Sequence, residues 1–172
     1  MGARYLSIAF VLSCVACSAG GARSAGGGDA HGLVGVRAPS FSRPGLMGAG
    51  TLSTDGAKGK VLIVDFWATY CTPCVKEFPK LQALVDKHGG SLVVYALSED
   101  DAADGIAAFV KKTSVRFPIA WDDGNSISLR YKLEKMPTSF IVDKKGIIRF
   151  VHSGYTDGED ERIAREVDEL MH

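Results

Sequence analysis

An apolar run that ends close to a pair of cysteines constrains the fold of this 172-residue chain more than any other feature. The run KVLIVDFWA at residues 60–68 is rich in β-branched residues and is interrupted only by Asp65. This composition predicts a strand that is buried on both faces of a sheet. Apolar residues then recur at helical spacing over residues 72–87, and glycines follow. Cys71 and Cys74 therefore lie where a buried strand gives way to a helix.

The middle of the chain continues to alternate between strand and helix patterns. Residues 91–98 predict a second buried strand. Residues 99–112 predict a helix with acids at its start and lysines at its end, as the helix dipole favours. Residues 117–121 predict a short strand, which leads through a turn at DDGN to a short helical segment over residues 126–133.

The C-terminal part predicts two strands and a helix. Residues 138–154 form two apolar runs that are joined by a turn at DKKG. Residues 156–171 predict an amphipathic helix that opens with a capping box of Thr156 and Glu159. Strands alternating with helices imply a parallel core, and a terminal hairpin adds antiparallel strands. We therefore expect an α/β fold with a mixed sheet.

The position of the two cysteines favours redox chemistry. Cys71 lies at or just before a helix N-terminus, where unpaired backbone N–H groups and the helix dipole stabilise a thiolate. This placement lowers the pKa of the thiol from about 8.5, commonly to about 7 or below. Cys74 lies in the first turn, so its sulfur can reach Cys71 and resolve a mixed disulfide within the protein. Pro73 suits the first turn because its missing N–H costs little there.

Other uses of the cysteine pair fit less well. A zinc site normally has four ligands, and the chain has no second close pair of cysteines or histidines. A purely structural disulfide that closes so short a loop would constrain the unfolded chain little. We therefore expect no metal site and no cofactor. The chain has 20 basic and 20 acidic residues, so overall charge gives no argument for binding nucleic acid.

The N-terminal region predicts export. Residues 1–17 combine a short positive start with an apolar run that is too short to span a bilayer comfortably. Cys14 and Cys17 follow this run as in a bacterial lipoprotein signal, and a lipid on either would tether the protein to a membrane. The alternative is a plain secretory signal. Residues 18–32 predict a flexible linker, and residues 33–172 predict the folded domain.

Several motifs together resemble a known family. VLIVDFWA, CTPC and MPTSFIVD resemble the thioredoxin fold. GVRAPSF at residues 35–41, KEFP with Glu77, and the long separation between Cys74 and Pro137 resemble more narrowly the TlpA/ResA-type thiol–disulfide oxidoreductases of the bacterial cell envelope. The resemblance implies a central mixed sheet flanked by helices. It also implies an N-terminal extension, and an extra strand and helix inserted between the CxxC helix and a cis-proline.

The resemblance also implies roles for individual residues. Pro137 would be the cis-proline that faces the cysteines. Asp65 would lie under the cysteines and help to move the proton of Cys74, or else have a structural role. Glu77 shares the helical face of Cys74 and would tune the pKa of the thiols or handle protons. Its alternative is an ordinary solvated helix glutamate.

A substrate-binding surface is expected around these residues. The backbone of Met136 would pair with an extended substrate strand. Tyr70 and Met136 depart from the family, which usually has tryptophan before the first cysteine and a smaller or β-branched residue before the proline. Trp67 is expected to pack in the core first and to line the active site second. The full expected surface comprises Trp67, Tyr70, Thr72, Pro73, Met136 and Thr138.

The resemblance implies that the function is disulfide reduction in the cell envelope. Cys71 would attack a disulfide of an exported protein such as apocytochrome c, and Cys74 would resolve the mixed disulfide. A membrane electron donor would then reduce the pair again. Pro73 matches the reducing thioredoxin motif and favours this direction. Two alternatives stay open, namely an oxidant or isomerase and a non-catalytic binding module. A peroxidase fits less well, because no PxxxTxxC motif surrounds either cysteine of the pair.

Overall fold

The computed structural model describes residues 1–2 and 31–172. Cys14 and Cys17, the candidates for lipid attachment, lie outside the described residues. The same holds for nearly all of the expected export signal at residues 1–17 and of the linker at residues 18–32.

A five-stranded mixed sheet forms the centre of the domain, with strand order β5-β4-β3-β6-β7. The central strand β3 is parallel to β4, and β4 is parallel to β5. On its other side β3 is antiparallel to β6, and β6 is antiparallel to β7. This order confirms the expected mixed α/β sheet. The strands are β3 (Val61–Trp67), β4 (Leu92–Ser98), β5 (Ile119–Trp121), β6 (Thr138–Val142) and β7 (Ile148–Ser153).

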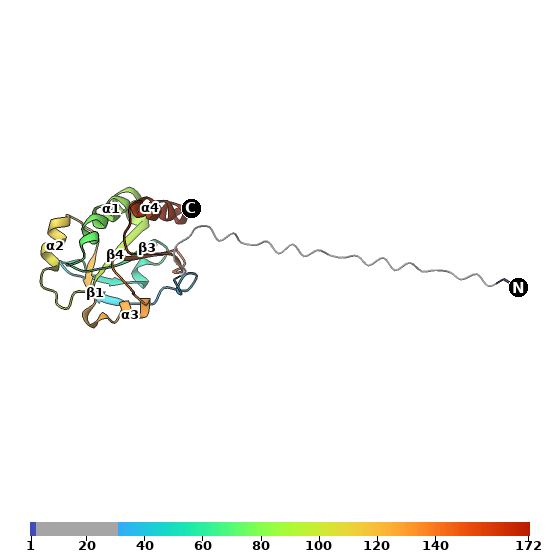
Figure 1. Cartoon of the computed structure of the whole chain (residues 1–172), viewed down its shortest axis with the longest axis horizontal. Helices are drawn as coiled ribbons and strands as arrows, with labels where there is room; N and C mark the ends of the chain where they lie inside the picture. Colours follow the sequence, from blue (N-terminus) through green and yellow to red (C-terminus); the bar gives the residue numbers. More distant parts are fainter. Residues whose placement is uncertain (3–30) are drawn as a thin grey trace.

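Helices and a small hairpin cover the two faces of the sheet (Figure 1). One face carries α1, α2 and α4, and the other carries α3 and the antiparallel pair β1–β2. Among the described residues, no helix is long and apolar enough to cross a membrane. The helices are α1 (Thr72–His88), α2 (Ile106–Thr113), α3 (Ser128–Tyr131) and α4 (Glu159–Met171), and the hairpin strands are β1 (Ser42–Pro44) and β2 (Thr51–Ser53). Short 3-10 turns lie at Asp55–Ala57, Gly89–Ser91 and Asp123–Asn125.

Strand β3 separates two hydrophobic cores. All seven of its residues are buried, as the apolar run predicts. Because side chains alternate across a strand, Trp67 packs against Phe78 of α1 with ring centroids 4.9 Å apart. Phe66 points to the opposite face and packs against Tyr131 of α3 at 5.2 Å. Asp65 shares the face of Trp67, so its carboxyl group lies on the side of the sheet that α1 and α4 cover.

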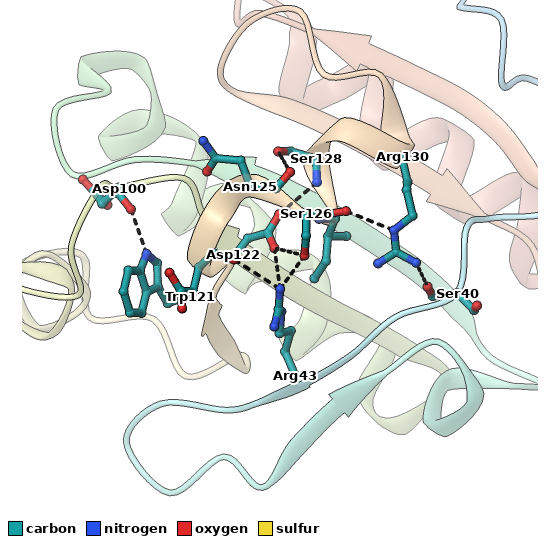
Figure 2. A network of polar contacts seen from close by, with 11 residues as sticks. Ser40, Arg43, Asp100, Trp121, Asp122, Asn125, Ser126, Ser128 and Arg130 are labelled. Carbon is teal, nitrogen blue, oxygen red and sulfur yellow. Dashed lines mark hydrogen bonds and ion pairs between the residues drawn. The ribbon is translucent and has the colours of Figure 1, made fainter.

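Hydrogen bonds around Asp122 join the N-terminal extension to the end of β5 (Figure 2). The guanidinium of Arg43 donates to Asp122 Oδ1 at 3.3 Å and also to the hydroxyl of Ser126. Asp122 Oδ2 accepts from the backbone N–H groups of Ile127 and Ser128 at 2.8 and 2.9 Å. A fully buried carboxylate therefore holds β1, β5 and the start of α3 together.

The second predicted helix begins later than the sequence pattern suggests. Helix α2 starts at Ile106, after Gly105 in the left-handed region with φ of 88°. The acids that precede it are used elsewhere, since Glu99 and Asp100 are buried at the end of β4. The carboxylate of Asp100 accepts hydrogen bonds from Thr69 and Ser98 in place of a favourable interaction with the helix dipole.

The capping box predicted for the C-terminal helix is also wrong in its geometry. Helix α4 starts at Glu159, and the residue that precedes it is Gly158 with φ of 86°. The hydroxyl of Thr156 donates to Glu159 Oε2 at 3.0 Å, so the two residues do interact. The other oxygen of Glu159 contacts His152 of β7, and this contact draws the carboxylate into the domain.

Candidate active site

The two cysteines form a disulfide at the N-terminal end of α1. Cys71 is the residue that precedes the helix, in extended conformation, and Pro73 lies in the first turn. The Cα atoms of Cys71 and Cys74 are 5.4 Å apart. Cys71 is 7% exposed and Cys74 is fully buried, so the sulfur of Cys71 is the one that an incoming substrate can reach.

A cis peptide bond joins Met136 to Pro137, immediately before β6. Thr138, the first residue of β6, pairs in register with Phe66 near the end of β3. The cis bond before β6 therefore lies at the same end of the central strands as the segment that leads from β3 to Cys71. Met136 is half-buried and packs against the core cluster that contains both cysteines.

Two carboxyl groups are buried near this end of the central strands, and both contact the hydroxyl of Ser139. Ser139 Oγ lies 2.7 Å from Asp65 Oδ1 and 3.2 Å from Glu77 Oε1. Asp65 and Ser139 are register partners on β3 and β6, and Glu77 comes from α1. A serine hydroxyl has a single proton to donate, so both contacts are hydrogen bonds only when one carboxyl group is protonated and donates to Ser139. The arrangement therefore suits a pair that holds one proton.

Burial shifts the acidity of this pair. Burial raises the pKa of Asp65 from 3.8 to about 7, against the lowering effect of the Ser139 hydrogen bond. Burial, followed by the nearby charge of Asp65, raises the pKa of Glu77 well above its ordinary value. Glu77 is only 3% exposed, so the alternative of a solvated helix glutamate is wrong. A carboxyl group with the pKa of Asp65 exchanges its proton near neutral pH.

The expected substrate-binding residues divide into exposed and buried ones. Tyr70 is 69% exposed next to Cys71, and Thr72 is exposed as well. Pro73 and Met136 are half-buried. Trp67 and Thr138, by contrast, are buried, so the prediction that they form part of the substrate-binding surface is wrong. The indole of Trp67 packs between Phe78 and Phe109, and the hydroxyl of Thr138 donates to the carbonyl of Lys135 at 2.8 Å.

A clamp on the loop before Cys71 was not anticipated from the sequence. Asp100 accepts hydrogen bonds from the backbone N–H of Thr69 at 3.0 Å and from its hydroxyl at 2.6 Å. Asp100 also accepts from the hydroxyl of Ser98 at 2.7 Å. The acid-rich stretch from residue 99 is visible in the sequence, but its pairing with Thr69 depends on the parallel contact between β3 and β4.

Comparisons with known proteins agree with this geometry. The model of the AhpC/TSA family matches residues 34–151. The chain is 35% identical to the thioredoxin-like protein YneN of Bacillus subtilis over 123 residues, which cover 70% of this chain and 71% of YneN. It is 32% identical to the thiol-disulfide oxidoreductase ResA of Bacillus thuringiensis over 136 residues, 78% of each chain. The chain belongs to the AhpC/TSA family, in the TlpA/ResA-like branch of thiol–disulfide oxidoreductases.

Solved structures support the fold of this oxidoreductase. A Chlorobium tepidum protein described as a candidate thiol:disulfide interchange protein, DsbE, superposes with a TM-score of 0.76 at 26% identity. The match covers 81% of this chain and 98% of that protein. The thioredoxin-like fold expected from the motifs is therefore confirmed, and so is the class of enzyme.

Proposed function

We propose that this protein is a cell-envelope thiol–disulfide oxidoreductase that reduces disulfides of exported proteins. The observation that carries the proposal is the Cys71–Cys74 disulfide at the start of α1, with Asp65 and Glu77 buried near that end of the central strands. A dithiol in which one cysteine is more accessible than the other, together with an internal proton acceptor, has the parts that disulfide exchange requires.

The reduced protein begins the reaction. The Cys71 thiolate attacks one sulfur of the substrate disulfide, and the other substrate sulfur leaves as a thiolate and takes up a proton. Cys74 then loses its proton and attacks Cys71, which forms the Cys71–Cys74 disulfide and releases the second substrate thiol. The helix N-terminus stabilises the Cys71 thiolate, and the Asp65–Glu77 pair accepts the proton of Cys74.

The substrate binds at the surface around Cys71. The backbone of Met136, which the cis bond to Pro137 orients, offers hydrogen-bonding groups to an extended substrate strand. Tyr70 and Thr72 flank Cys71 in the sequence and contact side chains of the substrate. Support for this arrangement comes from the exposure of Tyr70 and Thr72 and from the position of Met136 against the core cluster that contains the cysteines.

The envelope location and the substrate class belong to the same proposal. The apolar run within residues 1–17 and the cysteines at its end support export and lipid attachment at Cys14 or Cys17. The likeness to ResA-type proteins supports exported substrates, with apocytochrome c as one candidate, and a membrane electron donor.

The first experiment is to measure the reduction potential of the Cys71–Cys74 couple by equilibration with glutathione or dithiothreitol. A thioredoxin-like potential of about −270 mV supports a reductase. A potential near that of strong oxidants, about −120 mV, reverses the direction and makes the protein an oxidant. Reduction of insulin disulfides by the wild type and its loss in Cys71→Ser exclude a non-catalytic binding module.

A further inference from the structure

Three polar residues form a row across three neighbouring strands. Asp65 on β3 pairs in register with Ser139 on β6, and Ser139 pairs in register with His152 on β7. Register partners place their side chains on the same face of a sheet, with Cβ atoms about 5 Å apart. The row therefore runs from the buried carboxyl pair toward the edge of the sheet, under α1 and α4.

His152 lies between two glutamates of α4. Its Nδ1 contacts Glu159 Oε1, and its Nε2 lies 2.5 Å from Glu166 Oε2. The side chain of His152 is 5% exposed and that of Glu159 is 8% exposed, whereas that of Glu166 is 19% exposed. The chain of contacts thus leads from the interior at Glu159 to solvent at Glu166. A neutral imidazole has one N–H, so two carboxylate partners favour the doubly protonated ring.

The surrounding charges couple this histidine to the buried pair. The charge of Glu159 contributes to the raised pKa of Glu77, after burial and Asp65, which places the two glutamates within electrostatic reach. Burial alone lowers the pKa of His152, but its hydrogen bonds and charge interactions with Glu166 and Glu159 outweigh burial and raise it. The titratable and charged groups that α1, β3, β7 and α4 place around the row are Asp65, Glu77, Lys80, Tyr155, Glu159, Asp160, Arg162 and Glu166.

We propose that Glu159, His152 and Glu166 form a route along which the proton held by Asp65 and Glu77 exchanges with solvent. This inference rests on the proposed function, in which that pair accepts the proton of Cys74. Glu77 Oε2 is buried and has no hydrogen-bond partner among the described residues, so within the proposal a bridging water molecule carries the proton from this oxygen to Glu159. His152 acts through Glu77 and does not touch the sulfurs, so it is a positioning residue.

The proton balance of the resolving step is simple. The S–H bond of Cys74 breaks, its proton goes to the carboxylate of the buried pair, and the thiolate electrons form the bond to Cys71. The bond between Cys71 and the substrate sulfur breaks, and that sulfur leaves with its electron pair and takes a proton from solvent. The buried pair then returns its proton to solvent through Glu159, His152 and Glu166, so no net proton is lost or gained.

The test follows the reaction of the fully reduced protein with 5,5′-dithiobis(2-nitrobenzoate) in a stopped-flow instrument. Attack by Cys71 releases the first thionitrobenzoate, and resolution by Cys74 releases the second, so absorbance separates the two steps. In His152→Ala we expect an unchanged first phase and a second phase that is slowed at least about tenfold near neutral pH, with a shifted pH profile. Added imidazole should restore the second phase by filling the cavity that the substitution leaves.

Matched variants separate proton transfer from structural damage. Glu166→Gln keeps the shape of the side chain at the solvent end of the proton route and should slow only the second phase. It is the deciding variant if His152→Ala fails to fold. Asp168→Asn changes an exposed carboxylate of the same helix, which pairs with Lys87, and should react like wild type.

Two results overturn the inference. One is a second phase that has the wild-type rate and pH profile in both His152→Ala and Glu166→Gln. The other is a slowed second phase that imidazole leaves unchanged, which indicates a structural role. If the wild type itself releases no second thionitrobenzoate, the proposed function fails, and that result is distinct from both.

Discussion

Asp100 binds the backbone N–H and the hydroxyl of Thr69, two residues before Cys71. The clamp fixes the loop between β3 and α1 to the end of β4, and so it determines where the sulfur of Cys71 lies. The carboxylate is buried, and its hydrogen bonds replace those that water provides in the unfolded chain.

Removal of this clamp should both destabilise the domain and weaken catalysis. In Asp100→Ala, the N–H and hydroxyl of Thr69 lose their acceptor, and we expect the free energy of unfolding to fall by about 2–3 kcal/mol. Chemical denaturation of the oxidised protein measures this change. Asp101→Ala alters the exposed neighbouring acid and should change stability by less than about 0.5 kcal/mol. Equal effects of the two substitutions would show that the clamp contributes nothing.

The buried carboxyl pair should make stability depend on pH. The pKa of Asp65 is about 7 in the folded protein and 3.8 in the reference state, so between these values the folded state holds a proton that the unfolded state has released. The stabilising contribution is complete below about pH 3.8 and is lost as pH rises through about 7. We expect a loss on the order of 4 kcal/mol over this range.

Asp65→Asn should reduce that pH dependence, because an amide does not titrate, and the part that remains belongs to Glu77. Denaturation midpoints of the oxidised wild type and of the variant across the same pH range provide the measurement. A wild-type curve that rises with pH in this window, or a variant curve that keeps the wild-type slope, would contradict the assignment to Asp65.

Asp122 should be the most sensitive position in the network of Figure 2. In Asp122→Ala, the buried N–H groups of Ile127 and Ser128 and the guanidinium of Arg43 lose their acceptor. We expect the free energy of unfolding to fall by roughly 3 kcal/mol. The reduction potential should stay unchanged, because the hydrogen-bond partners of Asp122 lie on β1 and at the start of α3. Asp123→Ala, at the exposed adjacent position, is the control for thermal or urea denaturation.

Tyr70 should matter for protein substrates and not for small ones. Its ring is 69% exposed beside Cys71, so truncation removes contact area without opening a cavity. In Tyr70→Ala, kcat/KM for insulin should fall about 10-fold, which corresponds to roughly 1.4 kcal/mol of lost binding. The reaction with a small aromatic disulfide should keep its wild-type rate. A parallel loss with both substrates would place Tyr70 in the chemistry rather than in recognition.

The sequence was sufficient for the parts of the fold that depend on local pattern. The apolar run around Asp65 predicts β3, and the change to helical spacing after Cys71 predicts α1, because burial and periodicity are properties of short segments. The hairpin β1–β2 was not predicted, since its strands have only three residues each and no alternating pattern.

Contacts that depend on the register between strands could not be predicted from the sequence. Asp65 was recognised as an unusual charge in an apolar strand, yet its partner Ser139 lies 74 positions away. The start of α4 was misjudged because Thr156 and Glu159 satisfy the local capping pattern, while the contact with His152 comes from another strand. Tertiary partners decide where such side chains point, and a single sequence does not state them.

The position of Trp67 gives the protein an intrinsic optical signal. Its indole is fully buried, with ring centroids 4.9 Å from Phe78 and 4.5 Å from Phe109, in the same core cluster as both cysteines. The other of the two tryptophans, Trp121, is only half-buried at the end of β5. Because a disulfide quenches the emission of an indole close to it, we expect reduction of the cysteines to raise the emission of Trp67, which would report their oxidation state without any attached label.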